Sequence, residues 1–263
     1  MNTLPNPGFD FDVSAMPALP KLPGLFVTGT DTEVGKTLVA GAIARSLRRT
    51  GTRVAVFKPV ASGCRRSREG LISSDAEFLA ACADSTLPLA EIAPVRYLSP
   101  LAPNVAAQRE GRAVDLGAVF KAYRRLAGQA DLVVVEGIGG LLCPLSDEFW
   151  CIHLARMMDL AVVIVARPDL GTINHTLLTL HAARSANLRV AGVVVNRYRP
   201  DDAPTPDLSV STNPAQIAER GRTPVLALVP DEPGNSVEDA TLGADTRFVV
   251  DQVDWRRIAG LHA

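Results

Sequence analysis

The sequence predicts a doubly wound α/β domain, with a mostly parallel sheet and helices on both of its faces. Nearly continuous apolar runs recur along the chain, as expected for strands that are covered on both faces. Segments with apolar residues at helical spacing separate these runs. The 263 residues are 47% hydrophobic and 21% charged, which is a globular composition. This length allows one large α/β domain or two small ones.

A proline-rich segment precedes the predicted domain. Residues 1–23 contain five prolines and show no periodicity, so they are predicted to form a flexible N-terminal extension. The strand and helix patterns begin at Gly24. We therefore predict a single α/β domain over residues 24–263.

Predicted strands and helices alternate along this domain. Strands are expected at residues 24–28, 53–57, 131–136, 160–166, 188–196 and 224–230. Helices are expected at residues 36–50, 115–129 and 172–186. Gly51 ends the first helix, and the proline- and aspartate-rich residues 200–207 are expected to form a surface loop. In a sheet built from such units, ligands bind beyond the carboxyl ends of the strands, so functional residues should directly follow them.

The first strand is followed by GTDTEVGKT, a variant of the phosphate-binding loop. The strict pattern has glycine, four residues and then Gly-Lys-Ser/Thr, but here the first glycine lies one residue earlier, at Gly29. In such a loop, backbone N–H groups at a helix N-terminus bind phosphates, Lys36 reaches the outer phosphates and Thr37 binds magnesium. The alternative is an incidental strand–helix turn. The preceding strand and following helix favour the phosphate loop.

Acidic residues follow other strands and are candidates for a magnesium site. Magnesium prefers oxygen ligands, so carboxylates should converge on Thr37. Asp75 lies in ISSDAEF and could equally be a helix N-cap. Glu136 ends an apolar strand and precedes Gly-Ile-Gly-Gly. A buried acid is unfavourable without a partner, and the adjacent glycines suggest close approach of a ligand.

Lys58 follows the second predicted strand and precedes Pro59. The proline disfavours helical geometry at Lys58, which would direct its ammonium over the edge of the sheet. Only four of the 27 basic residues are lysines, and Lys36 and Lys58 are two of them. A solvated lysine at the end of a strand is the plain alternative for Lys58.

The composition excludes several other classes of protein. A net charge of -1 argues against a broad basic surface for nucleic acid. The sequence contains no apolar run long enough for a membrane span and no signal-peptide pattern. Its four cysteines have neither zinc-site spacing nor a disulfide pattern, which fits a reducing cytoplasm. We therefore expect a cytoplasmic protein that binds neither nucleic acid nor membrane.

Six motifs together resemble one enzyme family. VTGTDTEVGKT, KPVASG, SDA, VVVEGIGGLLCPLSD, GTINHTLLTL and GVVVN occur in one order, and over roughly residues 24 to 232 they resemble dethiobiotin synthetase. The variant phosphate loop is the form that this family uses. The resemblance implies an ATP-binding domain of the P-loop NTPase type, with ATP and Mg²⁺ as cofactors. It also implies a homodimer in which the residues 171–174 of the second subunit close the diamine pocket.

The implied reaction is an ATP-dependent closure of a ureido ring in biotin synthesis. 7,8-diaminopelargonate reacts with CO2 to give a carbamate, and ATP phosphorylates the carbamate to a carbamic-phosphoric anhydride. The second amine attacks this anhydride, which yields dethiobiotin and phosphate. Such a reaction requires positioning and electrostatic stabilisation more than a protein nucleophile.

The resemblance also implies roles for individual residues. Lys36 and Lys58 would be catalytic and would balance phosphate and carbamate charge, and Asn196 would read the adenine. The implied magnesium ligands are Thr37, Asp75 and Glu136. The implied substrate contacts are Thr32, Ser62, Gly171, Thr172 and Asn174, although Thr172 could equally serve only the helix turn and cap. The implied nucleotide contacts are Thr32, Glu33, Val34, Gly35, Lys36, Thr37, Leu38, Asp75, Glu136, Gly137, Ile138, Gly139, Asn196, Arg197, Val229, Pro230 and Asp231.

Two other classes of protein share this fold and are alternatives to the enzyme. A partitioning or septum-site ATPase switch carries a second lysine early in its phosphate loop, whereas this chain has Asp31 and Thr32 there. A binding module without catalysis would not need Lys36, Lys58 and Glu136 together. The chain also departs from the family: Asn104 stands where many members carry His, residues 63–70 are rich in Arg, and the tail after Pro233 matches weakly.

Overall fold

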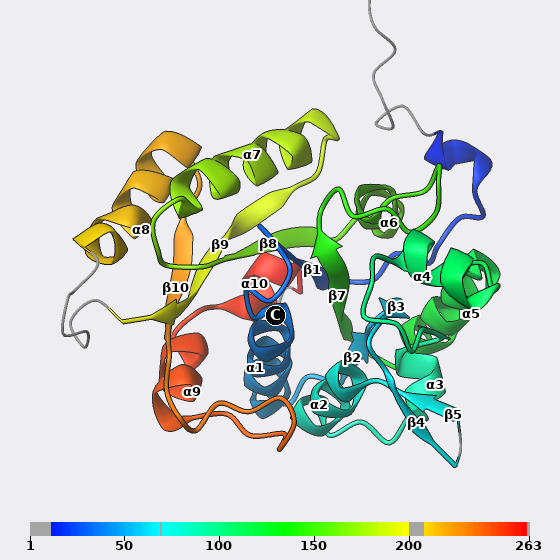
Figure 1. Cartoon of the computed structure of the whole chain (residues 1–263). Coiled ribbons are helices and arrows are strands. Elements are labelled where there is room, and N and C mark those ends of the chain that lie inside the picture. The colour runs from blue at the N-terminus through cyan, green and yellow to red at the C-terminus, as the bar shows by residue number, and fades with distance from the viewer. Residues whose placement is uncertain (1–11, 69, 200–207, 262–263) are drawn as a thin grey trace, which may run out of the picture.

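The computed structural model describes residues 12–68, 70–199 and 208–261 (Figure 1). Residues 1–11 of the predicted extension and the predicted surface loop at residues 200–207 lie outside the described residues.

A six-stranded sheet forms the centre of the domain, with the strand order β10-β9-β8-β1-β7-β2. Every neighbouring pair in this sheet is parallel, as the sequence predicts. The strands are β1 (Gly24–Gly29), β2 (Val54–Phe57), β7 (Leu132–Gly140), β8 (Ala161–Ala166), β9 (Val190–Tyr198) and β10 (Val225–Pro230). Each begins within two residues of a predicted strand, because long runs of buried aliphatic residues leave little ambiguity.

Helices cover both faces of the sheet, which confirms the doubly wound class (Figure 1). One face packs against α1 (Lys36–Arg49), α2 (Ser74–Ala83), α9 (Ala244–Asp251) and α10 (Trp255–Ala259). The other packs against α5 (Leu116–Ala127), α6 (Cys151–Met158), α7 (Thr172–Ser185) and α8 (Leu208–Gly221). The three predicted helices correspond to α1, α5 and α7.

Short elements connect the main ones, and periodicity did not reveal most of them. They are the 3-10 helix η1 (Val13–Ala15), the helices α3 (Leu89–Ile92) and α4 (Pro103–Glu110), and the strands β3 (Val60–Ala61), β4 (Arg65–Ser67), β5 (Gly70–Ile72) and β6 (Val95–Arg96). Strands β3 and β6 pair in parallel, while β4 and β5 form an antiparallel hairpin. Apart from α4, which has eight residues, these segments of two to four residues are too short for a repeating pattern.

The described part of the N-terminal extension lies against the domain. Met16, Leu19 and Leu22 are partly buried against the core beneath α5 and α6. The backbone carbonyl of Ala18 accepts a hydrogen bond from Arg124 of α5 at 3.1 Å. Residues 12–23 therefore make contacts that the lack of periodicity did not predict, and the domain boundary at residue 23 remains a prediction.

We expect deletion of residues 1–22 to lower the melting temperature more than deletion of residues 1–11. The longer deletion removes three partly buried aliphatic side chains, whose burial contributes about 2 kcal/mol. For a domain of this size, the difference between the two truncations should be about 4–8 °C. Thermal unfolding of both variants measures it. Equal melting temperatures would show that the contacts of residues 12–22 give no net stability.

Candidate active site

A pocket of about 770 Å³ opens at the carboxyl ends of the central strands. Its position agrees with the expectation for a doubly wound sheet. Sixteen of the residues predicted for the site line it: Thr32, Glu33, Gly35, Lys36, Thr37, Leu38, Lys58, Ser62, Asp75, Glu136, Ile138, Gly139, Asn196, Arg197, Pro230 and Asp231. The pocket thus brings together these sixteen residues, which are up to 199 positions apart in the sequence.

The phosphate loop forms one wall of the pocket and leads from β1 into α1. Gly35 has φ +91°, and a Cβ atom on it would lie 1.9 Å from Nδ2 of Asn196, so only glycine fits there. Because Gly35 provides no side-chain cap, the first N–H groups of α1 are left for a ligand. Lys36 is 7% exposed and donates a hydrogen bond from Nζ to the Asp31 carbonyl at 2.8 Å. Burial lowers the pKa of its ammonium.

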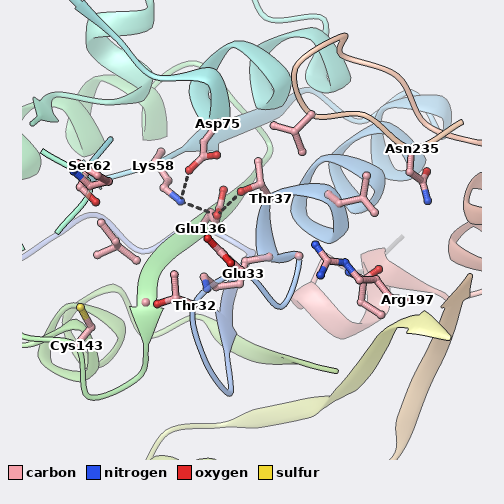
Figure 2. A pocket seen from close by; sticks show the side chains of 18 of the residues that line it. Thr32, Glu33, Thr37, Lys58, Ser62, Asp75, Glu136, Cys143, Arg197 and Asn235 are labelled. Carbon is pink, nitrogen blue, oxygen red and sulfur yellow. Dashed lines mark hydrogen bonds and ion pairs between the residues drawn. The ribbon is translucent and has the colours of Figure 1, made fainter. Parts of the chain in front are cut away.

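A buried ionic cluster of Lys58, Asp75, Glu136 and Thr37 lies beside this loop (Figure 2). Lys58 follows β2, and the other three side chains come from α2, β7 and α1. Nζ of Lys58 lies 2.5 Å from Oε1 of Glu136 and 2.8 Å from Oδ2 of Asp75. The Thr37 hydroxyl donates to the same Glu136 oxygen at 2.8 Å. Lys58 and Glu136 are only 3% and 1% exposed, which excludes the alternative of a solvated lysine at a strand end.

The surroundings of Lys58 keep its ammonium charged. Burial alone would lower the pKa of Lys58, but the carboxylates of Glu136 and Asp75 outweigh burial and raise it above its ordinary value. The Lys58 ammonium in turn is the main cause of the lowered pKa of Asp75. Ser73 is the N-cap of α2 and accepts from the Ala76 N–H group. Asp75 is therefore not needed as the cap, and its carboxylate is free to face the cluster.

The cluster also fits a magnesium ion. Oε2 of Glu136 is buried and has no hydrogen-bond partner, an unfavourable state that a cation would relieve. Within the described residues, no group of three or more His, Cys, Asp or Glu side chains could hold a metal. The two carboxylates and the Thr37 hydroxyl suit Mg²⁺, because this ion is usually bound through one or two carboxylates and keeps phosphate and water ligands.

The opposite end of the pocket contains Asn196 and the residues that follow β10. Asn196 is 1% exposed, and its Nδ2 donates to the Val34 carbonyl at 2.9 Å. Its Oδ1 is buried without a partner and can therefore accept a hydrogen bond from a ligand. Arg197, Pro230 and Asp231 line the same end.

Six predicted residues do not line the pocket. Val34 supports it through the Asn196 hydrogen bond, and the Gly137 carbonyl accepts from Lys58 at 3.3 Å. Val229 is fully buried within β10. The remaining three residues, Gly171, Thr172 and Asn174, lie at the start of α7.

The start of α7 shows a structural role for one of these three residues. Thr172 is fully buried and donates from Oγ1 to the Arg167 carbonyl at 2.6 Å, which fits the alternative of a turn and cap residue. Gly171 has φ +95°, and the Asn174 side chain is exposed. Their predicted contacts with substrate involve a second subunit and remain a prediction.

Sequence reasoning missed several residues that line the pocket. Pro100, Leu101 and Ala102 precede α4, and Cys143 follows β7. Asn235 and Val237 lie in the loop after β10. The rule that ligands bind after strand ends predicted Asp231. If the same rule had been applied to the Pro-Gly-Asn turn that follows, it would also have predicted Asn235. The weak family likeness after Pro233 gave no such guidance.

The chain matches a protein-family model and is similar in sequence to several known proteins. Residues 23–238 match a family model described as an AAA domain. ATP-dependent dethiobiotin synthetase BioD of Anaeromyxobacter sp. (strain K) is 44% identical over 221 residues, which are 84% of this chain and 96% of that protein. The protein of the same name from Bacillus subtilis (strain 168) is 37% identical over 79% of this chain and 87% of its own length.

Solved structures with low sequence identity share the fold. The MinC:MinD cell division protein complex of Aquifex aeolicus contains a chain with a TM-score of 0.55 and 14% identity, over 91% of this chain and 97% of that one. The septum site-determining protein MinD of Pyrococcus horikoshii OT3, complexed with Mg-ADP, gives a TM-score of 0.53 and 15% identity, over 89% and 94%. At this identity the likeness concerns the fold alone, which is of the P-loop NTPase type.

Proposed function

Because the chain belongs to the ATP-dependent dethiobiotin synthetase family, we propose that its pocket closes the ureido ring of dethiobiotin by way of a phosphorylated carbamate. As a member of this family, the protein is an ATP-dependent ligase that makes dethiobiotin in biotin biosynthesis. The observation that carries the finer proposal is the buried cluster of Lys58, Asp75, Glu136 and Thr37 beside the phosphate loop.

The order of side chains along the pocket supports this reaction. In Figure 2, Ser62 and Cys143 lie on one side of the ionic cluster, and Arg197 and Asn235 lie on the other. We assign the first side to the diamine and its carbamate, and the second to the adenine of ATP. The γ-phosphate would then lie next to the cluster, between the two substrates. This arrangement suits direct phosphoryl transfer, which depends on positioning and charge stabilisation.

Different residues of the pocket would stabilise different charges of the substrates. Lys36 and the N–H groups at the start of α1 would bind the phosphates of ATP. Thr37, Asp75 and Glu136 would hold magnesium, which would supply positive charge to the phosphates of ATP. Lys58 would stabilise the negative charge of the carbamate and of the phosphoryl group that it receives. Asn196, through its unpartnered Oδ1, would accept a hydrogen bond from the adenine amino group.

Completion of the diamine pocket by a second subunit is part of the same proposal. Gly171 and Asn174 begin α7 but do not line the pocket of their own chain. In a homodimer, these residues could reach the pocket of the partner subunit. The described part of the chain contains no helix that is long and apolar enough to cross a membrane. A cytoplasmic location remains an expectation, based on cysteine usage.

A coupled assay tests the proposed reaction. The purified protein, incubated with ATP, magnesium, bicarbonate and 7,8-diaminopelargonate, should form dethiobiotin and ADP in equal amounts. ATP hydrolysis should depend on both the diamine and bicarbonate. The competing function is an ATPase switch, whose fold this chain shares. ATP hydrolysis that responds only to a protein partner, without dethiobiotin, would contradict the proposed reaction.

Replacement of Ser62 with alanine should weaken apparent diamine affinity more than it slows the chemical step. Ser62 lines the diamine side of the pocket and is outside the ionic cluster, so its hydroxyl is available for substrate. Loss of one neutral hydrogen bond corresponds to about a tenfold rise in KM for the diamine at most. Steady-state kinetics at saturating ATP measure this change. A fall in kcat with unchanged KM would assign Ser62 to the chemical step instead.

A further inference from the structure

The loop between β10 and α9, residues 231–243, forms part of the pocket wall on the side where Asn235 and Arg197 lie in Figure 2. Asp231, Asn235 and Val237 of this loop line the pocket, together with Asn196 and Arg197. The phosphate loop and the ionic cluster account for the phosphate end. Under the proposed function, on which this inference rests, the base and ribose of the nucleotide therefore lie against this loop.

Side-chain hydrogen bonds attach the loop to the beginning of α9. Nδ2 of Asn235 donates to Oγ1 of Thr246 at 2.8 Å, and Oδ1 of Asn235 accepts from the Gly243 N–H group at 2.9 Å. The Glu232 carboxylate accepts from the Thr246 N–H group at 2.6 Å. These bonds connect the start of the loop, where Glu232 and Asn235 lie, with Gly243 at its end and with Thr246 in the first turn of α9.

The same hydrogen bonds restrict the conformation of the loop where it joins α9. Thr246 is fully buried, so its hydroxyl requires a partner, and Asn235 supplies it. A Cβ atom on Gly243 would lie 1.9 Å from Cδ of Glu232, which shows how closely the carboxylate packs against the backbone. Gly243 is the N-cap of α9 but has no capping side chain, and Glu232 takes that role from across the loop.

The charge of Glu232 is suited to this position. Partial burial acts to raise the pKa of its carboxyl group, but the hydrogen bonds from Thr246 and Asp245 outweigh burial and lower the pKa below its ordinary value. The negative charge also lies at the positive end of the α9 dipole. The ionised carboxylate is therefore stabilised by the contacts that hold the loop to α9.

We propose that Glu232, Asn235 and Thr246 form a positioning network that holds residues 231–243 against the base and ribose of the bound nucleotide. Glu232 and Thr246 do not line the pocket and act through the loop. The network therefore contributes to the affinity for a nucleotide, but not to the binding of phosphate groups alone. It also leaves the ionic cluster unchanged, so the rate at saturating ATP does not depend on it.

The Thr246→Val variant tests the network, because valine keeps the shape of threonine and removes only the hydroxyl. We expect Kd and KM for ATP to rise about tenfold, with kcat within about twofold of the unmutated protein. Affinity for inorganic tripolyphosphate, which has the phosphates without the base, should not change. Thr246→Ser keeps the hydroxyl and should restore the ATP affinity. Calorimetric titration and steady-state kinetics of each full-length variant give these values.

A matched control variant lies in the same loop. Ser236→Ala removes a hydrogen bond from Ser236 to Asp239 that stays within the loop, so it should leave ATP affinity unchanged. The network is overturned if Thr246→Val leaves ATP affinity unchanged, if ATP and tripolyphosphate weaken equally, or if Ser236→Ala weakens ATP binding as much. Because ATP titration does not require dethiobiotin formation, this result is distinct from failure of the proposed reaction.

Discussion

Replacement of Lys36 with alanine should reduce dethiobiotin formation by about 10³-fold while the domain remains folded. Lys36 follows the glycine of the phosphate loop, and its ammonium is held over that loop by the Asp31 carbonyl. A buried, prepositioned charge of this kind typically contributes about 10²–10³-fold to a rate. In this site Lys36 would also contribute to ATP binding, so the loss should exceed that of a group used only in the transition state.

The measurements for Lys36→Ala are ATP affinity, dethiobiotin formation and thermal unfolding. ATP affinity should fall, and the melting temperature should change little, because the Lys36 ammonium forms no ion pair in the structure described. Lys121→Ala is the matched control, since Lys121 is exposed on α5 and does not line the pocket. Normal ATP-dependent turnover by Lys36→Ala would contradict the assignment of residues 29–37 as the phosphate loop.

The parts of the fold that were predictable from the sequence depend on features that are local in the chain. The six central strands were predictable because each is a run of buried aliphatic residues, and the phosphate loop was predictable because its glycine, lysine and threonine are contiguous. The segment after Val135 shows the limit of such reasoning. The predicted strand ended at Glu136, but β7 continues through the following glycines to Gly140, which pairs with Gly29 of β1.

The contacts within the site could not be predicted in the same way. Lys58 and Glu136 are 78 positions apart, and their contact depends on β2 and β7 being neighbours in the sheet. The sequence could assign Lys58 to the edge of the sheet, but it could not show that two carboxylates surround the ammonium. Thr246 illustrates the same limit, because its role depends on a hydrogen bond to a residue in the preceding loop.

Replacement of Lys58 with glutamine should reduce dethiobiotin formation by about 10²–10³-fold and spare ATP binding. Glutamine is similar in length but carries no charge. Phosphorylation of a carbamate brings two anionic groups together, and they repel each other unless a cation lies between them. In Figure 2, Lys58 lies between Ser62 and Glu136, so under the proposed function its loss should affect the chemical step. A normal rate of dethiobiotin formation in this variant would contradict the assigned role.

The ionic cluster gives the same variant a second, independent readout. Without the Lys58 ammonium, the buried Glu136 carboxylate loses a partner at 2.5 Å and Asp75 loses one at 2.8 Å. Loss of one partner from a buried ion pair typically destabilises a protein by about 3–5 kcal/mol. We therefore expect a lower melting temperature for Lys58→Gln in a buffer with a chelator.

Magnesium should restore much of this stability, because a cation bound only by the folded protein stabilises it. The double variant Lys58→Gln/Glu136→Gln is the matched control, since it removes the unpaired carboxylate together with the ammonium. Its melting temperature with chelator should exceed that of Lys58→Gln, and magnesium should raise it less. If magnesium stabilises both variants equally, Glu136 is not a magnesium ligand. If Lys58→Gln is as stable as the unmutated protein with chelator, the ammonium does not balance the two carboxylates.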